Sequence, residues 1–143
     1  MAEKDQWITV PACDEDGRTI IVTANTDVEK FRSRPKYSIR VTVTLPYEPA
    51  DSLGFPDDET ARLLEQATDS FAALLKGKNT AVMTGIYTGA GVRDWVFYTF
   101  STEIFNRFLN LALAELPLLP LTISAENDPG WEEYDEMLES TAM

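Results

Sequence analysis

The sequence predicts an α+β fold, a ferredoxin-like βαββαβ sandwich with an N-terminal β-hairpin and a C-terminal helix. Its 143 residues suit one domain with a sizeable core. From residue 36 onward, segments with strand and helix periodicity follow one another as strand, helix, strand, strand, helix, strand. We expect a single domain over residues 1–143, with the hairpin over 5–24, the core over 36–125 and an acidic helix over 128–139.

The N-terminal hairpin rests on two short apolar runs, residues 7–10 and 19–23, which are rich in β-branched side chains. Asp16-Gly17 between them is a turn sequence, so the two runs are expected to pair. A basic stretch follows, and we expect its side chains to form ion pairs with acidic groups of the same chain. Its members are Lys30, Arg32, Arg34 and Lys36.

The first core strand and first long helix have the clearest patterns. Apolar and polar residues alternate strictly over 37–45, which predicts a strand with one buried face. Over 57–75 the apolar residues recur every three or four positions, which predicts a helix. Asp57 or Asp58 caps its start, and Gly77 ends it. The alternating apolar residues of the strand are Tyr37, Ile39, Val41, Val43 and Leu45.

The second half of the core begins with another hairpin. Residues 80–88 and 92–100 are β-rich, and we expect a three-residue, glycine-flanked loop between them. Ser101 caps a helix that should run to about residue 116, where Pro117 ends it. Residues 118–125 are then expected to form a strand that lies at a sheet edge or starts late, because Pro120 cannot donate a backbone hydrogen bond.

The C-terminal segment satisfies the local rules for starting a helix. Asp128 is the expected cap and Pro129 the expected first helical residue. Trp131, Tyr134 and Leu138 fall on one helical face, so we expect that face to dock on the body of the domain.

The charge distribution favours a basic protein as partner. The formal net charge is −12, which opposes binding to nucleic acid or to an anionic membrane. Residues 126–143 hold seven acidic residues and no basic one. We therefore expect the partner-binding residues to lie here and in the N-terminal hairpin loop. They are Asp128, Glu132, Glu133, Asp135, Glu136 and Glu139, with Asp14, Glu15 and Asp16 as a second acidic patch.

Residue types argue against an enzyme. The chain has no histidine, which excludes histidine-based acid–base chemistry, catalytic triads and histidine-ligated zinc. Its one cysteine, Cys13, lies beside three carboxylates that disfavour the thiolate. We expect no catalytic residue, metal or cofactor, although chemistry by two carboxylates remains open. The single cysteine and the absence of an apolar leader suggest a cytoplasmic setting.

The chain resembles a bacterial family known as domain of unknown function 695, over about residues 7–138. The resemblance is carried by Trp7, by the Thr-Gly hairpin with Arg93 and the aromatic pair at 97–98, and above all by the Asp-Pro-x-Trp-x-x-Tyr motif of residues 128–134. The family implies no activity. Its members are sometimes joined to a domain similar to the protein regulator of ribonuclease E, a small acidic inhibitor.

Together these features predict a non-catalytic binding protein that neutralises a basic partner, such as an immunity protein for a nuclease-type or other toxin. Trp95 or Tyr47 are candidate aromatic anchors for that interface. Three alternatives stay open at this point: a housekeeping ribonuclease regulator, a small-ligand binder or enzyme, and a domain whose acidity serves only solubility.

Overall fold

The computed structural model describes residues 7–13, 15–52, 54–114, 116–117 and 119–141. The strands are β1 (Trp7–Cys13), β2 (Thr19–Asn25), β3 (Ile39–Pro46), β4 (Ala81–Gly89), β5 (Val92–Thr99) and β6 (Thr122–Asn127). The helices are α1 (Glu29–Arg32), α2 (Asp58–Leu75), α3 (Thr102–Leu113) and α4 (Glu132–Thr141).

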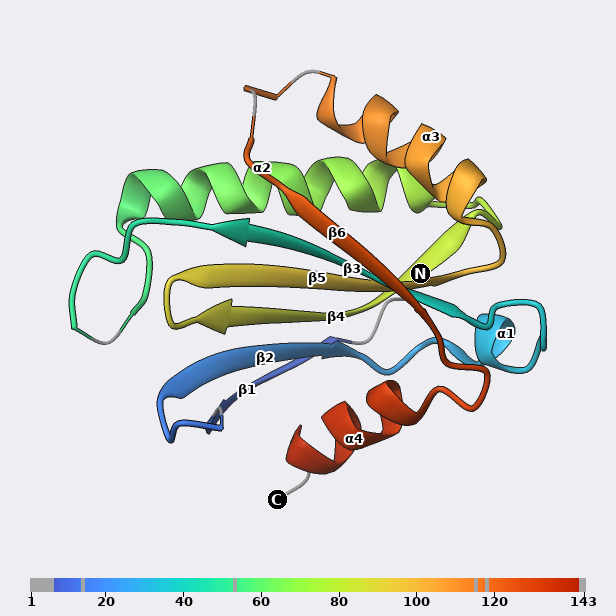
Figure 1. The fold of residues 1–143 in the computed structure, drawn as a ribbon, viewed down its shortest axis with the longest axis horizontal. Helices are drawn as coiled ribbons and strands as arrows, with labels where there is room; N and C mark the ends of the chain where they lie inside the picture. Colours follow the sequence, from blue (N-terminus) through green and yellow to red (C-terminus); the bar gives the residue numbers. More distant parts are fainter. Residues whose placement is uncertain (1–6, 14, 53, 115, 118, 142–143) are drawn as a thin grey trace.

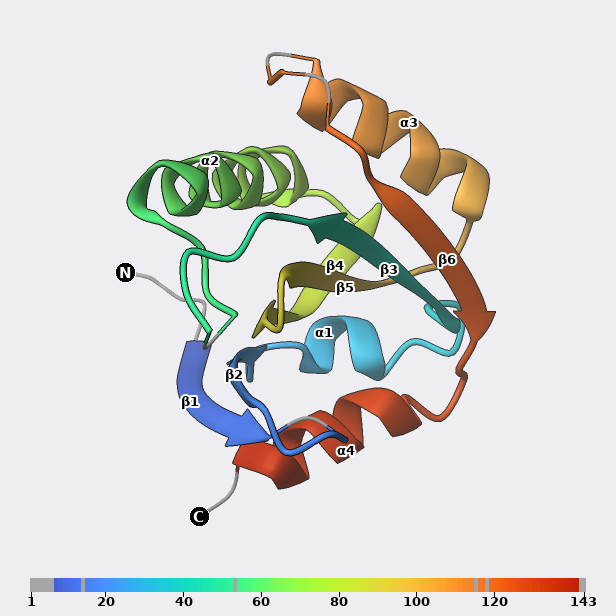
Figure 2. The same cartoon turned by 60° about the vertical axis from the view of Figure 1, so that its left-hand side comes forward.

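The fold is a mixed α/β arrangement around one six-stranded sheet, in which every strand pair is antiparallel. The strand order is β1-β2-β4-β5-β3-β6. Helices α2 and α3 cover one face of the sheet, and α4 lies on the other (Figure 1). Strand β6, at one edge of the sheet, leads from α3 to α4 (Figure 2). The predicted α+β class is confirmed, whereas the six-stranded order does not match the four-stranded ferredoxin-like pattern.

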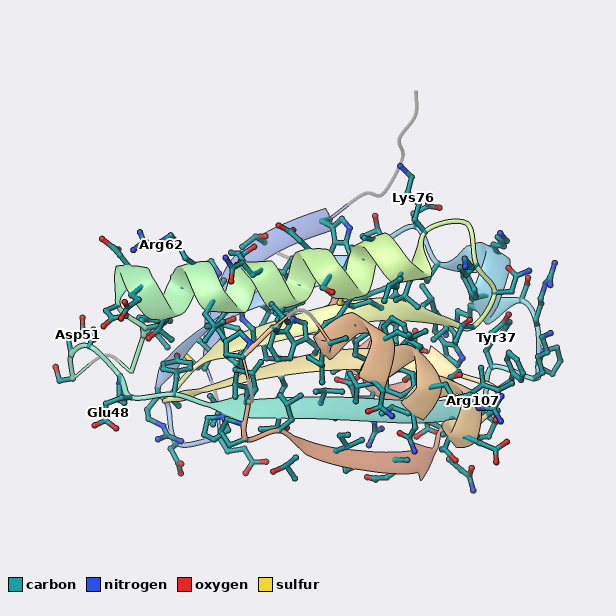
Figure 3. The ribbon with its side chains drawn as sticks, turned by 90° about the horizontal axis from the view of Figure 1, so that it is seen from above. Tyr37, Glu48, Asp51, Arg62, Lys76 and Arg107 are labelled. Atoms are coloured by element: carbon teal, nitrogen blue, oxygen red, sulfur yellow. The ribbon has the colours of Figure 1, made fainter. Side chains whose placement is uncertain are left out.

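The larger core lies between the sheet and the helices α2 and α3. Phe71 of α2 is fully buried and makes edge contacts with Trp95 and Phe97 of β5, at centroid distances of 5.2 and 5.7 Å. The predicted cap of α2 is confirmed, because the Asp57 side chain accepts a hydrogen bond from the Thr60 backbone N–H. Figure 3 shows the two helices side by side over the sheet.

The two predicted hairpins are confirmed, with one correction to the second. Strands β4 and β5 are joined by two residues, not three, because Gly89 still pairs with Val92. The turn residues Ala90 and Gly91 have φ values of 54° and 81°. Two consecutive positive φ values are typical of the type I′ turn, whose twist matches that of the flanking strands.

The second core lies on the opposite face of the sheet, under α4. Trp131 and Tyr134 are 2% exposed, which confirms the predicted docking face, and Leu138 packs against the same cluster. The Trp131 ring stacks on Tyr98 of β5 at 4.1 Å between centroids, and its Nε1 donates to the backbone oxygen of Tyr37 at 2.8 Å.

Two details of this region differ from the sequence prediction. Tyr37 lies before the start of β3 and packs in the second core, so it does not continue the alternation of Val41 and Val43, which face the first core. The short helix α1 was not predicted, because its four residues lack a recognisable apolar stripe.

Met137 of α4 approaches the sheet closely because β4 has a glycine opposite it. A Cβ atom at Gly85 would collide with the Met137 sulfur. Gly85 lies at a register irregularity of the β4–β5 ladder, where a bulge changes the local spacing. The missing side chain therefore makes room for the helix.

Three segment boundaries also need correction. Helix α3 ends at Leu113, before the predicted end at residue 116. Strand β6 spans 122–127, later than the predicted 118–125, although it lies at a sheet edge as Pro120 indicated. Pro129 lies in a turn, and α4 begins three residues later at Glu132.

None of the helices in the described part of the chain has the length and apolar character needed to cross a membrane.

We predict that Trp131→Ala lowers the free energy of unfolding by about 3–5 kcal/mol, because it removes a buried indole and leaves a cavity. Denaturant unfolding at neutral pH measures the change. Leu111→Ala is the control, because Leu111 is 67% exposed and its loss should change stability by less than about 0.5 kcal/mol. Equal effects of the two variants would contradict a docked α4.

Candidate functional site

The acidic residues of the C-terminal segment divide between two sides of α4. Glu132, Glu136 and Glu139 are exposed, and their spacing of four and three residues places them on one helical face. Among the residues that the structure describes, none of the three forms an ion pair. We call these three residues the acidic face of α4.

Asp128 is buried and joins β6, α4 and the sheet. Its carboxylate accepts hydrogen bonds from the backbone N–H groups of Glu132 and Glu133 at 2.9 and 3.1 Å, which caps α4 as predicted. It also accepts the Tyr98 hydroxyl at 2.7 Å and lies 3.4 Å from the Arg40 guanidinium. Burial raises the pKa of Asp128, but these hydrogen bonds and Arg40 outweigh it and hold the pKa below its usual value.

Asp135 is engaged within the fold. It forms an ion pair of 2.8 Å with Arg32, which confirms the predicted internal pairing for that member of the basic stretch. The Arg32 guanidinium also lies over the rings of Trp131 and Tyr134, at 5.9 and 5.6 Å from their centroids. Arg32 thus holds α1 against α4.

Glu133 lies on the flank of α4, at the edge of the acidic face, and lines a groove beside α4 on the same face of the sheet. Its Oε2 accepts a hydrogen bond from the Tyr87 hydroxyl, while its Oε1 is buried without a partner. Burial raises the pKa of the Glu133 carboxyl, an effect that Tyr87 and Arg40 only partly offset. The pKa of Tyr87 is raised as well, by burial and by Glu133.

The second predicted patch lies in the turn between β1 and β2. Glu15 and Asp16 are exposed there, whereas Asp14 lies outside the described residues. Asp16 forms an exposed ion pair of 3.2 Å with Arg18. The two strands that this turn joins, β1 and β2, both contact α4.

The predicted aromatic anchors have other roles. Trp95 has no exposed surface and its Nε1 donates to Thr68 Oγ1 at 2.8 Å, so the prediction of an interface anchor is wrong for this residue. Tyr47 is half-buried, and its hydroxyl donates to the Gly54 backbone oxygen at 2.7 Å.

The groove beside Glu133 was not predicted. Because Trp95 and Phe97 face the first core, the alternation of β5 turns Asp94 and Val96 toward the α4 side. The groove has a volume of about 550 Å³. A second hollow of about 430 Å³ adjoins it at Arg40 and Glu133 and is otherwise lined by Asn127, Asp128, Pro129, Glu132 and Glu136. The lining of the groove is Arg18, Ile20, Arg40, Thr42, Tyr87, Thr88, Gly89, Ala90, Val92, Asp94, Val96 and Glu133.

The polar residues of β3, which alternate with its core residues, were a sequence signal for this groove because they indicate a second, polar-lined face of the sheet. Arg40, Thr42 and Thr44 occupy the non-core positions of β3, and only the sheet order shows that Asp94 lies directly opposite Thr44. The position of Glu133 depends on how α4 docks, which local pattern does not specify.

Comparison with known proteins gives one match. The model of a family described as "Family of unknown function (DUF695)" matches residues 5–139. Neither the curated proteins nor the solved structures include a match to the chain.

We predict that Asp128→Asn lowers the free energy of unfolding at pH 7 by about 1.5–3 kcal/mol, because it weakens several hydrogen bonds to a buried charge. The folded pKa of Asp128 lies below its unfolded value, so this stabilisation is present above the unfolded pKa and is lost as pH falls through the folded one. Denaturant unfolding from pH 7 to pH 2 measures it. A difference between wild type and variant that stays constant at low pH would contradict the role of the charge.

We predict the opposite sign for Glu133→Gln. The folded pKa of Glu133 is raised, so its contribution is favourable below the unfolded pKa and is lost as pH rises through the folded one. Glutamine keeps an acceptor for Tyr87 without a buried charge. The variant should therefore have a higher thermal midpoint than wild type at pH 7 and an equal one near pH 4. A lower midpoint at pH 7 would show that the charge itself stabilises the fold.

Proposed function

The chain belongs to the DUF695 family, whose function is unknown, and we propose that it is a non-catalytic acidic protein that binds and inhibits a basic protein. The observation that carries this proposal is the acidic face of α4. Glu132, Glu136 and Glu139 form a row of exposed carboxylates on a helix whose opposite side is fixed by Trp131 and Tyr134.

The helix dipole favours Glu132 in the first turn of α4, but two other features of this row disfavour the helix. Glu132 and Glu136 are like charges at i,i+4, and Glu139 lies near the C-terminal end, where the helix dipole disfavours a negative charge. Among the described residues, no cation on the same face of α4 forms an ion pair that would offset this repulsion and the unfavourable dipole interaction. A row of exposed carboxylates without internal cations is the arrangement expected of a surface that binds the basic side chains of a partner protein.

Electrostatic attraction would act first on the rate of association. Complementary charge raises the rate constant above the value of about 10⁵–10⁶ M⁻¹s⁻¹ for uncharged surfaces. Glu15 and Asp16, exposed in the turn between two strands that contact α4, would add to the negative potential on this side of the molecule. We assign partner binding to these five exposed residues, and a supporting role to Asp128, Glu133 and Asp135.

We further propose that the partner is a nuclease-type or other toxin, which makes this chain an immunity protein. A nuclease has a cationic cleft for phosphates, and a rigid row of carboxylates is able to occupy phosphate positions. The alternative partner is a housekeeping ribonuclease, and the identity of the captured protein distinguishes the two. An immunity protein is expected to be encoded beside its toxin.

For the fold, we propose that the segment from β3 to β6 is a ferredoxin-like unit extended by the β1–β2 hairpin. Two arrangements support this. One strand, β5, separates β3 from β4, and one strand, β3, separates β5 from β6, as in a pair of split βαβ units. The extension at the β4 edge accounts for the two additional strands of the sheet.

We predict that reversing the acidic face, with Glu132→Lys, Glu136→Lys and Glu139→Lys together, weakens capture of the basic partner from the native host at low salt. In purified form, the association rate constant should fall by at least tenfold, and its dependence on salt should decrease. Inhibition of the partner's nuclease or toxic activity by wild type is measured in parallel.

The matched control reverses three exposed acids on the α2–α3 side, Glu59→Lys, Asp69→Lys and Glu103→Lys, and so changes the net charge equally. Equal losses from both variants would show that net charge alone matters. Unchanged binding in the α4 variant would overturn the proposed surface. Turnover in a hydrolase panel that a single carboxylate substitution abolishes would overturn the non-catalytic assignment.

A further inference from the structure

The groove beside α4 has the size and composition of a ligand site. Its volume of about 550 Å³ lies within the range of small-molecule pockets, about 300–1,000 Å³. Ile20 of β2 and Val92 and Val96 of β5 contribute apolar surface, and the polar groups converge from β3, β4, β5 and α4. Apolar lining with a few placed polar groups is the usual make-up of such pockets.

Two carboxylates of the groove, those of Asp94 and Glu133, form no ion pair of 4 Å or less among the residues that the structure describes, although Arg40 is near enough to Glu133 to lower its pKa. Asp94 accepts the Thr44 hydroxyl at 2.5 Å, and Glu133 accepts the Tyr87 hydroxyl. Tyr87 and Asp94 are directly paired across β4 and β5, so the three polar groups follow one another across the groove. The remaining oxygen of Glu133, Oε1, has no hydrogen-bond partner at all.

The arginines of the groove are already engaged. The Arg40 guanidinium lies 3.0 Å from the Glu126 carboxylate and 3.4 Å from that of Asp128. Arg18 is paired with Asp16 at 3.2 Å. With these pairs formed, the charge that is left uncompensated in the groove is negative, which favours a cation over an anion.

We propose that this groove binds an aliphatic primary ammonium group, with Asp94 and Glu133 as its charged acceptors and the apolar floor in contact with its carbon chain. An ammonium group donates three hydrogen bonds, which suits two carboxylates and a tyrosine hydroxyl oxygen. The methylene chain suits Ile20, Val92 and Val96. A lysine side chain of a protein and a free amine share this chemistry.

The groove adjoins the acidic face of α4, because Glu133 lies on the flank of the helix and lines both the groove and the hollow that Glu132 and Glu136 also line. Asp94 has no part in the proposed inhibition and lines the groove but not that hollow, so Asp94→Asn tests the groove separately from the proposed function. A variant of the groove should leave the charge of the exposed face intact, and a reversal of that face should leave the groove residues in place.

Two probes test the proposal by NMR titration or calorimetry of the full chain: cadaverine, and N-acetyl-lysine-methylamide. Their uncharged counterparts are pentanol and N-acetyl-norleucine-methylamide. We expect saturable binding of at least one amine at millimolar or lower concentration, with shifts confined to groove residues, and no saturation with the uncharged compounds. Binding of cadaverine alone indicates a free amine as ligand, and preference for the lysine amide indicates a protein lysine.

The variants are Asp94→Asn and Glu133→Gln, which keep acceptors for Thr44 and Tyr87 and so should keep the fold. Each should weaken amine binding by about tenfold or more, since it removes a charge-assisted hydrogen bond. Asp69→Asn, an exposed carboxylate of α2, is the control and should leave binding unchanged. Thermal unfolding verifies that every variant is folded.

Three results would overturn the proposal. The first is equal binding of amine and uncharged counterpart, which would show a purely apolar site. The second is undiminished amine binding in a folded Asp94→Asn/Glu133→Gln double variant. The third is tighter binding of acetate or inorganic phosphate than of either amine, which would show that Arg40 is the recognising group.

Discussion

The Asp128 carboxylate fixes the side of the sheet on which α4 lies. It follows β6 directly, accepts the first backbone N–H groups of α4, and is bound from the sheet by Tyr98 and Arg40. A helix N-terminus favours a negative charge, so one carboxylate satisfies the helix, the hydroxyl and the guanidinium together. The turn that follows places the Trp131 ring on Tyr98, and the remaining apolar residues of α4 pack along β1, β2 and β4.

This anchoring gives the two sides of α4 different chemistry. Since Trp131 and Tyr134 fix the rotation of the helix, Glu132 and Glu136 must face solvent and Glu133 must face the sheet. Neighbouring glutamates of one segment therefore have opposite environments. The exposed pair remains available to a partner, whereas Glu133 is desolvated beside Tyr87, and its pKa is raised by that burial.

Local patterns predicted the elements whose signals lie within a few residues of sequence. Asp57 capping α2, the hairpin turn at Asp16-Gly17 and the docking of Trp131 are of this kind. The groove was beyond reach, because Asp94, Tyr87 and Glu133 meet only through the pairing of β4 with β5 and the docking of α4. The interface prediction for Trp95 was wrong for the same reason. Which residues of β5 face the core depends on how the strand pairs in the sheet, and tryptophan is common both in cores and at interfaces.

Net charge is a poor guide to where this protein binds. Arg18, Arg32, Arg40, Arg93 and Arg107 each have a carboxylate partner within the fold, so much of the positive charge is already compensated locally. Exposed charges act over about 8 Å at physiological salt, so distant acids add little to a given surface. The acids without an ion pair in the described part of the chain include the row on the outer side of α4 and the two carboxylates of the groove, besides scattered exposed acids such as Glu59 and Asp69 of α2. The row and the groove differ from those scattered acids in that several carboxylates belong to one surface, and we propose that each binds a cation from outside the described part of the chain.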